Sequence, residues 1–455
     1  MDDISNDRYM MNRVVRVSID YLDSKGRGIG NFNGKKIIVD YVVPGDVVDV
    51  EVYVICKGRR GRYKEYHGRV IDIVSEGEGR IEPKCRFFGI CGGCRFQNWD
   101  YSYQLRFKRG VVIEAMERWS VNGEVKDIIP SPKIWYYRNR MDYAISYDGK
   151  VGLKEYGSWS KILDLTECYL MSEESTKIMQ ETRDFMSEYK VPGWDLFKHE
   201  GFLRYVVIRE GKFTGDRMVN YITWSKQFKY LDELVNKLTS KNLITSFVWG
   251  INPTITDVSV AKDLRFIWGK DHLTEKIESY TFHVHPNAFF QTNSFQTITL
   301  AKLVRKLASG GRDLLDLYSG VGLFSVFLSD MYDNVTGIEV EESAVNSGKI
   351  SLKWNGVSNV NYVASRVEDV VNLYEDREID TVIIDPPRPG MARKVVNSIL
   401  RMSPKEIIYV SCNPDTMMRD ISWLCESYSI EDPIYPIDMF PHTPHIEVVA
   451  RLVRK

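Results

Sequence analysis

The C-terminal part of the chain alternates short apolar runs with helical sequence, and this alternation limits the possible folds more than any other feature. A helix is predicted over 295–308. Apolar strand candidates follow it at 313–317, 335–340, 380–385 and 406–410. Short, continuously apolar strands separated by helices are typical of a parallel sheet with helices on both faces. We therefore expect a doubly wound α/β sheet.

The composition is that of a soluble globular protein with several domains. The chain has 455 residues, 44% of them hydrophobic, and at about 100–200 residues per domain this length predicts about three domains. No apolar stretch approaches the roughly 20 residues that cross a bilayer, and the polar, acidic first residues do not form a signal peptide. We expect a cytoplasmic protein with no membrane partner.

The charge balance hides a local excess of cations. Lys and Arg number 61 and Asp and Glu 62, so the net charge by itself argues weakly against a nucleic-acid partner. The stretch Lys57–Lys64, however, is strongly basic, and Tyr63 and Tyr66 lie within or beside it. Cations interleaved with tyrosines suit a phosphate backbone and unstacked bases. The alternative interpretation is a solvated loop.

The basic stretch belongs to a segment, residues 10–74, that reads as a small β-barrel. Short runs rich in β-branched residues lie at 14–19, 36–39, 47–52 and 70–74, with glycine turns between them. The segment resembles a TRAM domain, an RNA-binding module with an oligonucleotide-binding fold. The resemblance rests on Gly26–Gly30 (Gly-Arg-Gly-Ile-Gly), the Val-Pro-Gly-Asp turn at 43–46 and the later basic strand.

A glycine turn after the first strand of the α/β sheet predicts a cofactor site. Asp316 begins the run Asp-Leu-Tyr-Ser-Gly-Val-Gly-Leu-Phe, in which Gly320 and Gly322 allow close approach of a ligand. A dinucleotide site would have a third glycine, but Ser325 stands there. Glu339 ends the next strand, where it can accept hydrogen bonds from ribose hydroxyls. An adenosine without pyrophosphate fits, which indicates S-adenosylmethionine. An ordinary strand–helix turn with a surface glutamate is the alternative.

Two further strand ends carry candidate catalytic groups on the same edge of the sheet. Asp385 begins Asp-Pro-Pro-Arg-Pro-Gly, whose prolines fix the direction of the carboxylate. Arg388 replaces the aromatic residue that methylases of exocyclic amines use, and the loop has no cysteine of the kind that cytosine-C5 methylases tend to place there. Cys412, in Ser-Cys-Asn-Pro, follows the strand at 406–410. A buried cysteine of the core is the alternative interpretation.

A methylase that acts on a pyrimidine carbon needs both a thiolate and a base. C5 of uracil is a weak nucleophile, but addition of a thiolate to C6 gives an enolate whose C5 can attack a methyl sulfonium. A base must then remove the C5 proton so that the thiolate can leave. Glu447, at the start of the last apolar strand, is the candidate base and Cys412 the candidate nucleophile.

These motifs, in this order, resemble the RNA uracil-C5 methyltransferases that form 5-methyluridine in tRNA and 23S rRNA. The resemblance implies a class I methyltransferase sheet with a Rossmann-like fold, an RNA partner and S-adenosylmethionine. It implies catalytic roles for Cys412 as nucleophile, Glu447 as base and Asp385 as a uracil contact. It places the cofactor contacts on Gln291, Tyr318, Gly320, Glu339 and Asp385. It also places Phe289 near the target base.

Four of the seven cysteines predict a metal centre. Cys85, Cys91 and Cys94 form Cys-x5-Cys-x2-Cys, and Cys168 is the best candidate for a fourth ligand. Zinc or a [4Fe–4S] cluster satisfies four thiolates. Zinc sites more often show two Cys-x2-Cys pairs, so the spacing favours iron–sulfur, and the family resemblance implies the same.

The whole-chain prediction has three parts: a TRAM-like barrel at 10–74, an α+β central RNA-facing domain with the cysteine loop at 75–285, and the methyltransferase domain at 286–455. We expect a monomer. Two alternatives stay open: a non-catalytic iron–sulfur RNA-binding protein on a methylase fold, and an RNA cytosine-C5 methyltransferase. The sequence does not decide between tRNA and 23S rRNA. His283-Val284-His285 has a spacing that can chelate metal, but with no third ligand near in sequence we interpret it as a plain strand.

Overall fold

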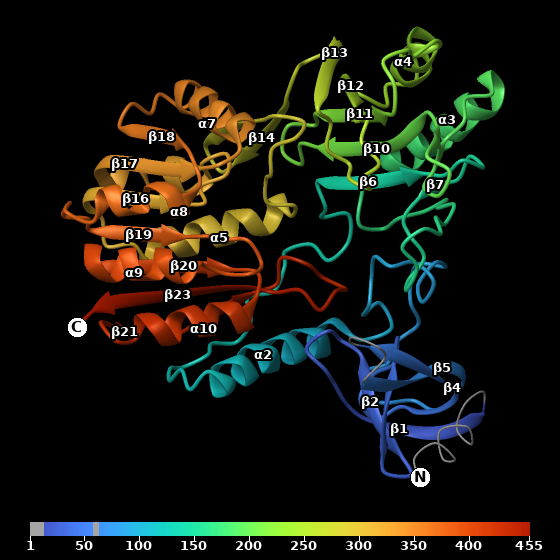
Figure 1. Ribbon diagram of the computed structural model, residues 1–455, viewed down its shortest axis with the longest axis horizontal. Coiled ribbons are helices and arrows are strands. Elements are labelled where there is room, and N and C mark those ends of the chain that lie inside the picture. The colour runs from blue at the N-terminus through green and yellow to red at the C-terminus, as the bar shows by residue number, and fades with distance from the viewer. Residues whose placement is uncertain (1–12, 58–62) are drawn as a thin grey trace. The chain divides into compact units, whose positions relative to one another are not determined.

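The computed structural model describes residues 13–57 and 63–455 (Figure 1). The chain separates into two compact units. The N-terminal unit comprises the described residues through Val111 together with Phe440–Pro444, and the C-terminal unit comprises Val112–Met439 and His445–Lys455. Among the described residues, no helix has the length and apolarity needed to span a bilayer.

The N-terminal unit contains a closed five-stranded barrel in the order β1-β2-β3-β5-β4. Its strands are β1 (Val14–Leu22), β2 (Gly28–Phe32), β3 (Lys35–Val39), β4 (Val47–Lys57) and β5 (Tyr63–Ser75). Buried and exposed positions alternate along most of β1, so that Val15, Val17 and Ile19 face the core. A Cβ on Gly30 would lie 2.3 Å from the carbonyl oxygen of Ser18, which explains the glycine in this close strand pair. The predicted barrel is confirmed, but most of the basic stretch lies at 58–62, outside the described residues.

The barrel is followed by a turn-rich segment and then by helix α2 (Tyr101–Arg118). Gln104 of α2 is buried and donates through Nε2 to the carbonyl oxygens of Phe96 (2.9 Å) and Trp99 (2.8 Å). Its Oε1 accepts from the backbone N–H of His442 at 3.0 Å. These contacts fix the segment Phe440–Pro444 on the N-terminal unit.

The central part of the C-terminal unit is a six-stranded sheet with helices, in the order β13-β12-β11-β10-β6-β7. Its strands are β6 (Arg140–Ile145), β7 (Val151–Gly152), β10 (Leu203–Glu210), β11 (Arg217–Thr223), β12 (Ser246–Ile251) and β13 (Asp263–Gly269). The helices are α3 (Glu173–Tyr189) and α4 (Leu231–Thr239), and a small pair is formed by β8 (Trp194–Asp195) and β9 (Glu200–Gly201). The hairpin β14 (Leu273–Ile277) and β15 (Tyr280–Val284) leads from this sheet toward the last one.

The last part of the C-terminal unit is an eight-stranded sheet in the order β18-β17-β16-β19-β20-β23-β21, with β22 paired to β23 (Figure 1). The strands are β16 (Gly311–Leu317), β17 (Tyr332–Glu339), β18 (Val360–Ala364), β19 (Thr381–Ile384), β20 (Glu406–Ser411), β21 (Tyr428–Ile430), β22 (Tyr435–Ile437) and β23 (Glu447–Arg454). The helical elements are α5 (Ser294–Leu307), α6 (Leu323–Phe327), η2 (Ser329–Met331), α7 (Glu342–Trp354), α8 (Val367–Val370), η3 (Val371–Tyr374), α9 (Arg393–Met402) and α10 (Pro414–Leu424).

The pairing within this sheet confirms the predicted parallel α/β arrangement. Strands β16 to β20 pair in parallel, whereas β23 runs antiparallel to β20. Every residue of β19 and β20 is buried, as expected for strands that are covered on both faces. Because β23 runs in the opposite direction, its first residue lies at the edge where the parallel strands end.

Candidate active site

The carboxyl edge of the parallel sheet gathers the residues predicted to act in catalysis. Tyr318, Glu339, Asp385 and Cys412 each follow or end a parallel strand, namely β16, β17, β19 and β20. Glu447 reaches the same edge as the first residue of the antiparallel β23, since Ser411 of β20 pairs with Val448. Strand ends at this edge are the usual place for ligands in open α/β sheets.

The glycine turn after β16 has a backbone that few other residues tolerate. Tyr318, Gly320 and Gly322 have positive φ angles of 62°, 55° and 83°. A Cβ on Gly322 would lie 1.7 Å from the hydroxyl oxygen of Tyr362, so that a side chain does not fit there. The turn is closed by a hydrogen bond from the N–H of Gly322 to the carbonyl of Ser319 (2.8 Å).

Glu339 is held by backbone donors at the end of β17. Its Oε2 accepts from the N–H of Gly320 at 2.9 Å, and its Oε1 accepts from the N–H of Glu341 at 2.8 Å. The side chain is half-buried, and each carboxylate oxygen has a second lone pair. The carboxylate is thus oriented in advance beside the glycine turn, as a group that binds two neighbouring hydroxyls requires.

Gln291 reaches Asp385 from the loop that precedes α5. Its Nε2 donates to Oδ2 of Asp385 at 3.4 Å. The backbone of this loop is fixed by Asn139, whose Nδ2 donates to the carbonyl of Gln291 (2.8 Å) and to Oγ of Ser294 (2.8 Å). Asn293 caps α5 by accepting from the N–H of Gln296 at 3.1 Å. The loop that carries Gln291 is therefore held by Asn139, which is distant in sequence, and by the start of α5.

Three acidic side chains and one cation determine the electrostatics of the site. Burial and the charge of Asp316 raise the pKa of Asp385 to about 7. Burial and the charge of Asp385 raise the pKa of Glu447 well above its ordinary value, although Arg388 opposes this effect. Burial and the charge of Glu447 raise the pKa of the Cys412 thiol to about 11, again against the influence of Arg388. In this state the thiol is protonated at neutral pH.

Arg388 is fixed by contacts on both sides of the proline loop. Its carbonyl oxygen accepts from Nδ2 of Asn413 (2.9 Å) and Oγ1 of Thr416 (3.1 Å), which join its loop to the start of α10. Its guanidinium lies 3.0 Å from Nδ1 of His445. The sequence suggested only that Arg388 argues against amine methylation, and it gave no role to the cation. In the structure Arg388 is the side chain that favours the ionised forms of Cys412 and Glu447.

Asp316 was noted in the sequence only as the start of the glycine motif, and its part in the site's electrostatics was not predicted. It is fully buried, and its Oδ2 accepts from the N–H (3.0 Å) and hydroxyl (2.6 Å) of Ser325. Burial raises the pKa of Asp316 to about 7, with a further contribution from Glu339. An acid inside the apolar run Leu314–Leu317 was the signal that could have found it.

Two candidate contacts remain, one for the cofactor and one for the target nucleobase, and their side chains are half-buried and exposed. The hydroxyl of Tyr318 donates to Glu368 at 3.2 Å, and burial and the charge of Glu368 raise the pKa of this phenol above its ordinary value. Phe289 is 60% exposed although it is a large apolar side chain. An exposed ring on the loop that carries Gln291 is available to stack on a base.

The four cysteines predicted to bind metal are divided between the two units. Cys85, Cys91 and Cys94 lie in the N-terminal unit, where the loop is folded by hydrogen bonds from the N–H of Cys91 to the carbonyl of Phe87 (2.8 Å) and from the N–H of Cys85 to Oε1 of Gln97 (3.0 Å). Cys168 lies in the C-terminal unit, beside the hydroxyl of the buried Tyr143. The role of all four as ligands stays a prediction.

Comparison with known proteins gives matches along the whole chain. A family model described as tRNA (Uracil-5-)-methyltransferase matches residues 254–455, and a TRAM domain model matches residues 8–53. The tRNA (uracil(54)-C(5))-methyltransferase of Pyrococcus horikoshii is 38% identical over 96% of this chain and 100% of its own. The 23S rRNA (uracil(747)-C(5))-methyltransferase of the same organism is 35% identical over 97% of this chain and 100% of its own.

A solved structure is also similar over nearly the full length. The crystal structure of Pyrococcus abyssi tRNA (uracil-54, C5)-methyltransferase in complex with S-adenosyl-L-homocysteine has a TM-score of 0.79 and 35% identity to this chain. The match covers 96% of this chain and 100% of the other. The similarity therefore includes the barrel, the central sheet and the last sheet.

Proposed function

The chain belongs to the tRNA (uracil-5-)-methyltransferase family, and from this premise we propose that it transfers a methyl group from S-adenosylmethionine to C5 of a uridine in RNA. One observation supports the assignment of the chemistry above the others. Cys412 directly follows β20 and Glu447 begins the paired strand β23, at the sheet edge that also carries Asp385. Asp385 raises the pKa of Glu447, and Glu447 raises the pKa of Cys412.

The glycine turn and its surroundings are proposed to hold S-adenosylmethionine. Tyr318 and Gly320 form the turn, and Glu339 beside it has oriented lone pairs for the two ribose hydroxyls. Gln291 and Asp385 continue the site toward the nucleophile. The donor and acceptor types fit an adenosine that carries an amino acid, because the turn approaches the ligand through backbone and lacks a pyrophosphate-binding third glycine.

The proposed reaction begins at Cys412. Its thiol loses a proton to solvent and the sulfur adds to C6 of uracil, so that the C5–C6 double bond opens and negative charge develops on C5 and O4. C5 then attacks the methyl group, the methyl–sulfur bond of the donor breaks, and S-adenosylhomocysteine leaves. Glu447 takes the proton from C5, the C5–C6 double bond forms again, and the Cys412 thiolate is expelled.

The raised pKa of Glu447 suits this role, because a base with a pKa closer to neutral accepts a proton more readily than an ordinary carboxylate does. Asp385 is proposed to hold the uracil ring by hydrogen bonding. With a pKa of about 7 it can accept a hydrogen bond from N3–H when ionised and donate one to O4 when protonated.

We propose that Cys85, Cys91, Cys94 and Cys168 hold a [4Fe–4S] cluster. The first three thiols lie on one short folded loop, and cysteine thiolates are the ordinary ligands of such clusters. Because the methyl transfer is redox-neutral, we assign the cluster a structural or RNA-placing role. Anaerobic purification with iron and zinc analysis tests this. Zinc in place of iron would refute the cluster, and full activity of a folded cluster-free preparation would refute the RNA-placing role.

The three predicted segments receive the following roles. Residues 10–74 bind RNA through the barrel, residues 75–285 face RNA and carry the cysteine loop, and residues 286–455 bind the methyl donor and perform the transfer. Relatives of similar identity are named for tRNA and for 23S rRNA. Methylation of a tRNA transcript and of a 23S rRNA fragment by the same preparation, followed by mapping of 5-methyluridine, identifies the substrate.

The mechanism is tested with RNA that contains 5-fluorouridine. With fluorine in place of hydrogen at C5, no proton is left for the base to remove and elimination is blocked. The wild-type protein with S-adenosylmethionine is therefore expected to form a stable covalent complex. Cys412→Ala should abolish this complex, whereas Cys425→Ala, a matched change of a half-buried cysteine, should leave it intact. With ordinary uridine RNA, Glu447→Gln should accumulate the methylated adduct because its elimination is blocked.

The same experiment separates the alternatives. A cytosine-C5 methyltransferase would form its adduct with RNA that contains 5-fluorocytidine and not with RNA that contains 5-fluorouridine. A non-catalytic RNA-binding protein would form no adduct with either of these RNAs. An adduct that persists in Cys412→Ala would refute the assignment of the nucleophile.

A further inference from the structure

Two histidines and an aspartate, none of them among the residues assigned to methyl transfer, gather at the hairpin β14–β15. His283 of β15 was interpreted from the sequence as part of a plain strand, because no third ligand is near it in sequence. In the structure Asp271 and His272 lie next to it. One donor atom from each of the three side chains lies within 4.8 Å of the other two.

The register of the hairpin explains why these side chains meet. Thr274 of β14 pairs with His283 of β15, so that His272, two residues before Thr274, points to the same face as a diagonal neighbour of His283. The two imidazole rings are stacked, with centroids 4.3 Å apart and planes inclined by 28°. A pair of histidines is therefore placed by strand pairing itself.

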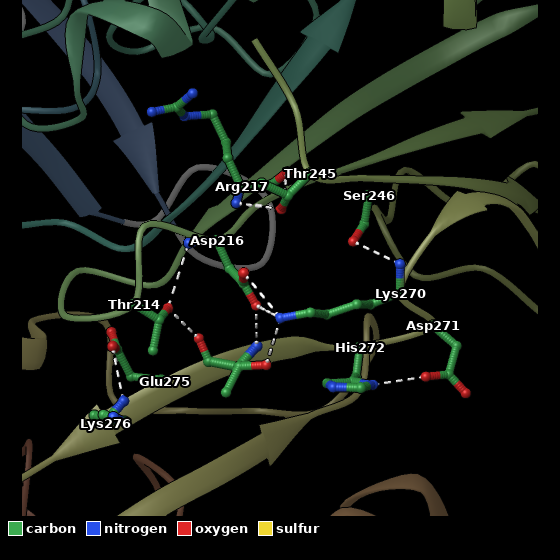
Figure 2. A network of polar contacts seen from close by, with 11 residues as sticks. Thr214, Asp216, Arg217, Thr245, Ser246, Lys270, Asp271, His272, Glu275 and Lys276 are labelled. Atoms are coloured by element: carbon green, nitrogen blue, oxygen red, sulfur yellow. Dashed lines mark hydrogen bonds and ion pairs between the residues drawn. The ribbon is translucent and has the colours of Figure 1, made fainter. Parts of the chain in front are cut away.

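The link that carries Asp271 and His272 is fixed at both ends. Lys270 donates through Nζ to both carboxylate oxygens of Asp216 (3.0 and 2.8 Å), and the N–H of Thr274 donates to the same carboxylate at 3.1 Å (Figure 2). The N–H of Lys270 donates to Oγ of Ser246 at 3.2 Å. The ammonium of Lys270 is thus engaged with Asp216, and Figure 2 shows it directed toward that residue and away from Asp271. Ligands on a fixed link lose little freedom when an ion binds.

Each histidine has one ring nitrogen oriented by another polar group. Nδ1 of His272 lies 2.6 Å from Oδ1 of Asp271 (Figure 2), and Nδ1 of His283 lies 3.1 Å from Oγ of Ser347. This leaves Nε2 of each ring and a second carboxylate oxygen for a ligand, and such outer hydrogen bonds are usual for metal-binding histidines.

The three side chains also differ in exposure in a way that admits an ion from solvent. His283 is buried, His272 is half-buried and Asp271 is exposed, while Trp354 at the end of α7 packs against both rings. Two imidazoles and one carboxylate form a set that prefers zinc and neighbouring transition metals to magnesium or calcium. We infer that Asp271, His272 and His283 bind a divalent transition-metal ion such as Zn²⁺.

Metal binding to the full-length protein tests the inference, with Co²⁺ as a spectroscopic probe after treatment with a chelator. Cysteine thiolates give an intense charge-transfer band with Co²⁺, whereas a site with nitrogen and oxygen ligands gives only weak d–d bands, so the two kinds of site are distinguishable. We expect one bound Co²⁺ with weak bands only, lost in His272→Gln and in Asp271→Asn. His199→Gln, a change of an exposed histidine elsewhere, is the matched control. Equal Co²⁺ binding in all of these proteins would overturn the inference.

Thermal unfolding gives a second readout that does not depend on activity. Zn²⁺ at about 100 times its dissociation constant is expected to raise Tm by roughly 4 °C for a unit of this size. The rise should be absent in His272→Gln and present in His199→Gln. His272→Gln and Asp271→Asn change half-buried and exposed side chains, so that loss of folding is not expected to obscure the result. A rise of the same size in all variants would show that the histidines are only a packed aromatic group with Trp354.

Discussion

Cys412 is expected to react slowly with an alkylating reagent although it is the proposed nucleophile. Only the thiolate reacts with iodoacetamide. With a pKa of about 11 in place of the ordinary 9.0, the thiolate fraction of Cys412 at pH 7.5 falls about a hundredfold, from roughly 3 in 100 to roughly 3 in 10,000. Alkylation of Cys412 should therefore be about a hundred times slower than that of an unperturbed thiol, and it should quicken about tenfold for each unit of pH up to pH 10.

Two substitutions should move this reactivity in opposite directions. Glu447→Gln removes a negative charge that raises the pKa of Cys412, so alkylation at pH 9–10 should be faster. Arg388→Met removes the cation that opposes this effect, so alkylation should be slower. One pKa unit corresponds to about 1.4 kcal/mol, and we expect each change to alter the rate by about tenfold.

The measurement follows the peptide that contains Cys412 by mass spectrometry after timed alkylation. Cys56, which is exposed in the same protein, serves as the internal reference for reagent activity at each pH. A rate for Cys412 that levels off below pH 9 would contradict the raised pKa. A slower reaction in Glu447→Gln would contradict the assigned electrostatic roles.

The remaining predictions concern stability and binding. Because the pKa of Asp316 is raised to about 7, its contribution to stability is complete below about pH 4 and is lost as the pH rises through 7. Asp316→Asn should therefore raise the free energy of unfolding in urea at pH 8 by up to about 4 kcal/mol and change it little at pH 4. A larger increase at pH 4 than at pH 8 would refute this. Gly322→Ala should abolish binding of S-adenosylhomocysteine in calorimetry because its Cβ meets Tyr362, whereas Gly320→Ala, with no atom within 4 Å of the added Cβ, should retain more affinity. Phe289→Ala should raise the KM for RNA by about fivefold or more, since stacking is worth roughly 1–3 kcal/mol per base, with Tm unchanged; an unaltered KM would exclude a contact with the base.

Local patterns in the sequence were sufficient to predict β16, β17, β19 and β20, whereas β18 was not predicted. The apolar runs at 313–317 and 406–410 fall within β16 and β20, and the glycine turn follows β16 as expected. A parallel sheet brings its strand ends to one edge, so Glu339, Asp385 and Cys412 could be grouped before their positions were known. Glu447 could be assigned to the same edge only through family resemblance, because nothing local in the sequence states that β23 runs antiparallel.

Relations between distant segments could not be predicted. Asn139 fixes the loop of Gln291 across 152 residues of sequence, and no pattern within either segment indicates that contact. The approach of His272 to His283 depends on the register of β14 and β15, which the turn between them determines. The pKa values depend on burial and on charges contributed by several strands, and therefore needed the assembled site.

The electrostatics of the site suit the proposed role of Glu447 as the base. Glu447 and Asp385 both suppress ionisation of Cys412, which keeps the resting thiol protonated and unreactive toward other electrophiles. The same burial that disfavours the thiolate also disfavours the ionised form of Glu447, so this side chain gains from accepting a proton. In the proposed mechanism, protonation of Glu447 removes one negative charge beside Cys412, which makes the thiolate a better leaving group at the moment when it is expelled from C6. The acid that restrains the nucleophile in the resting state thus assists its release at the end of the cycle, and Arg388, which favours both ionised forms, lessens the restraint.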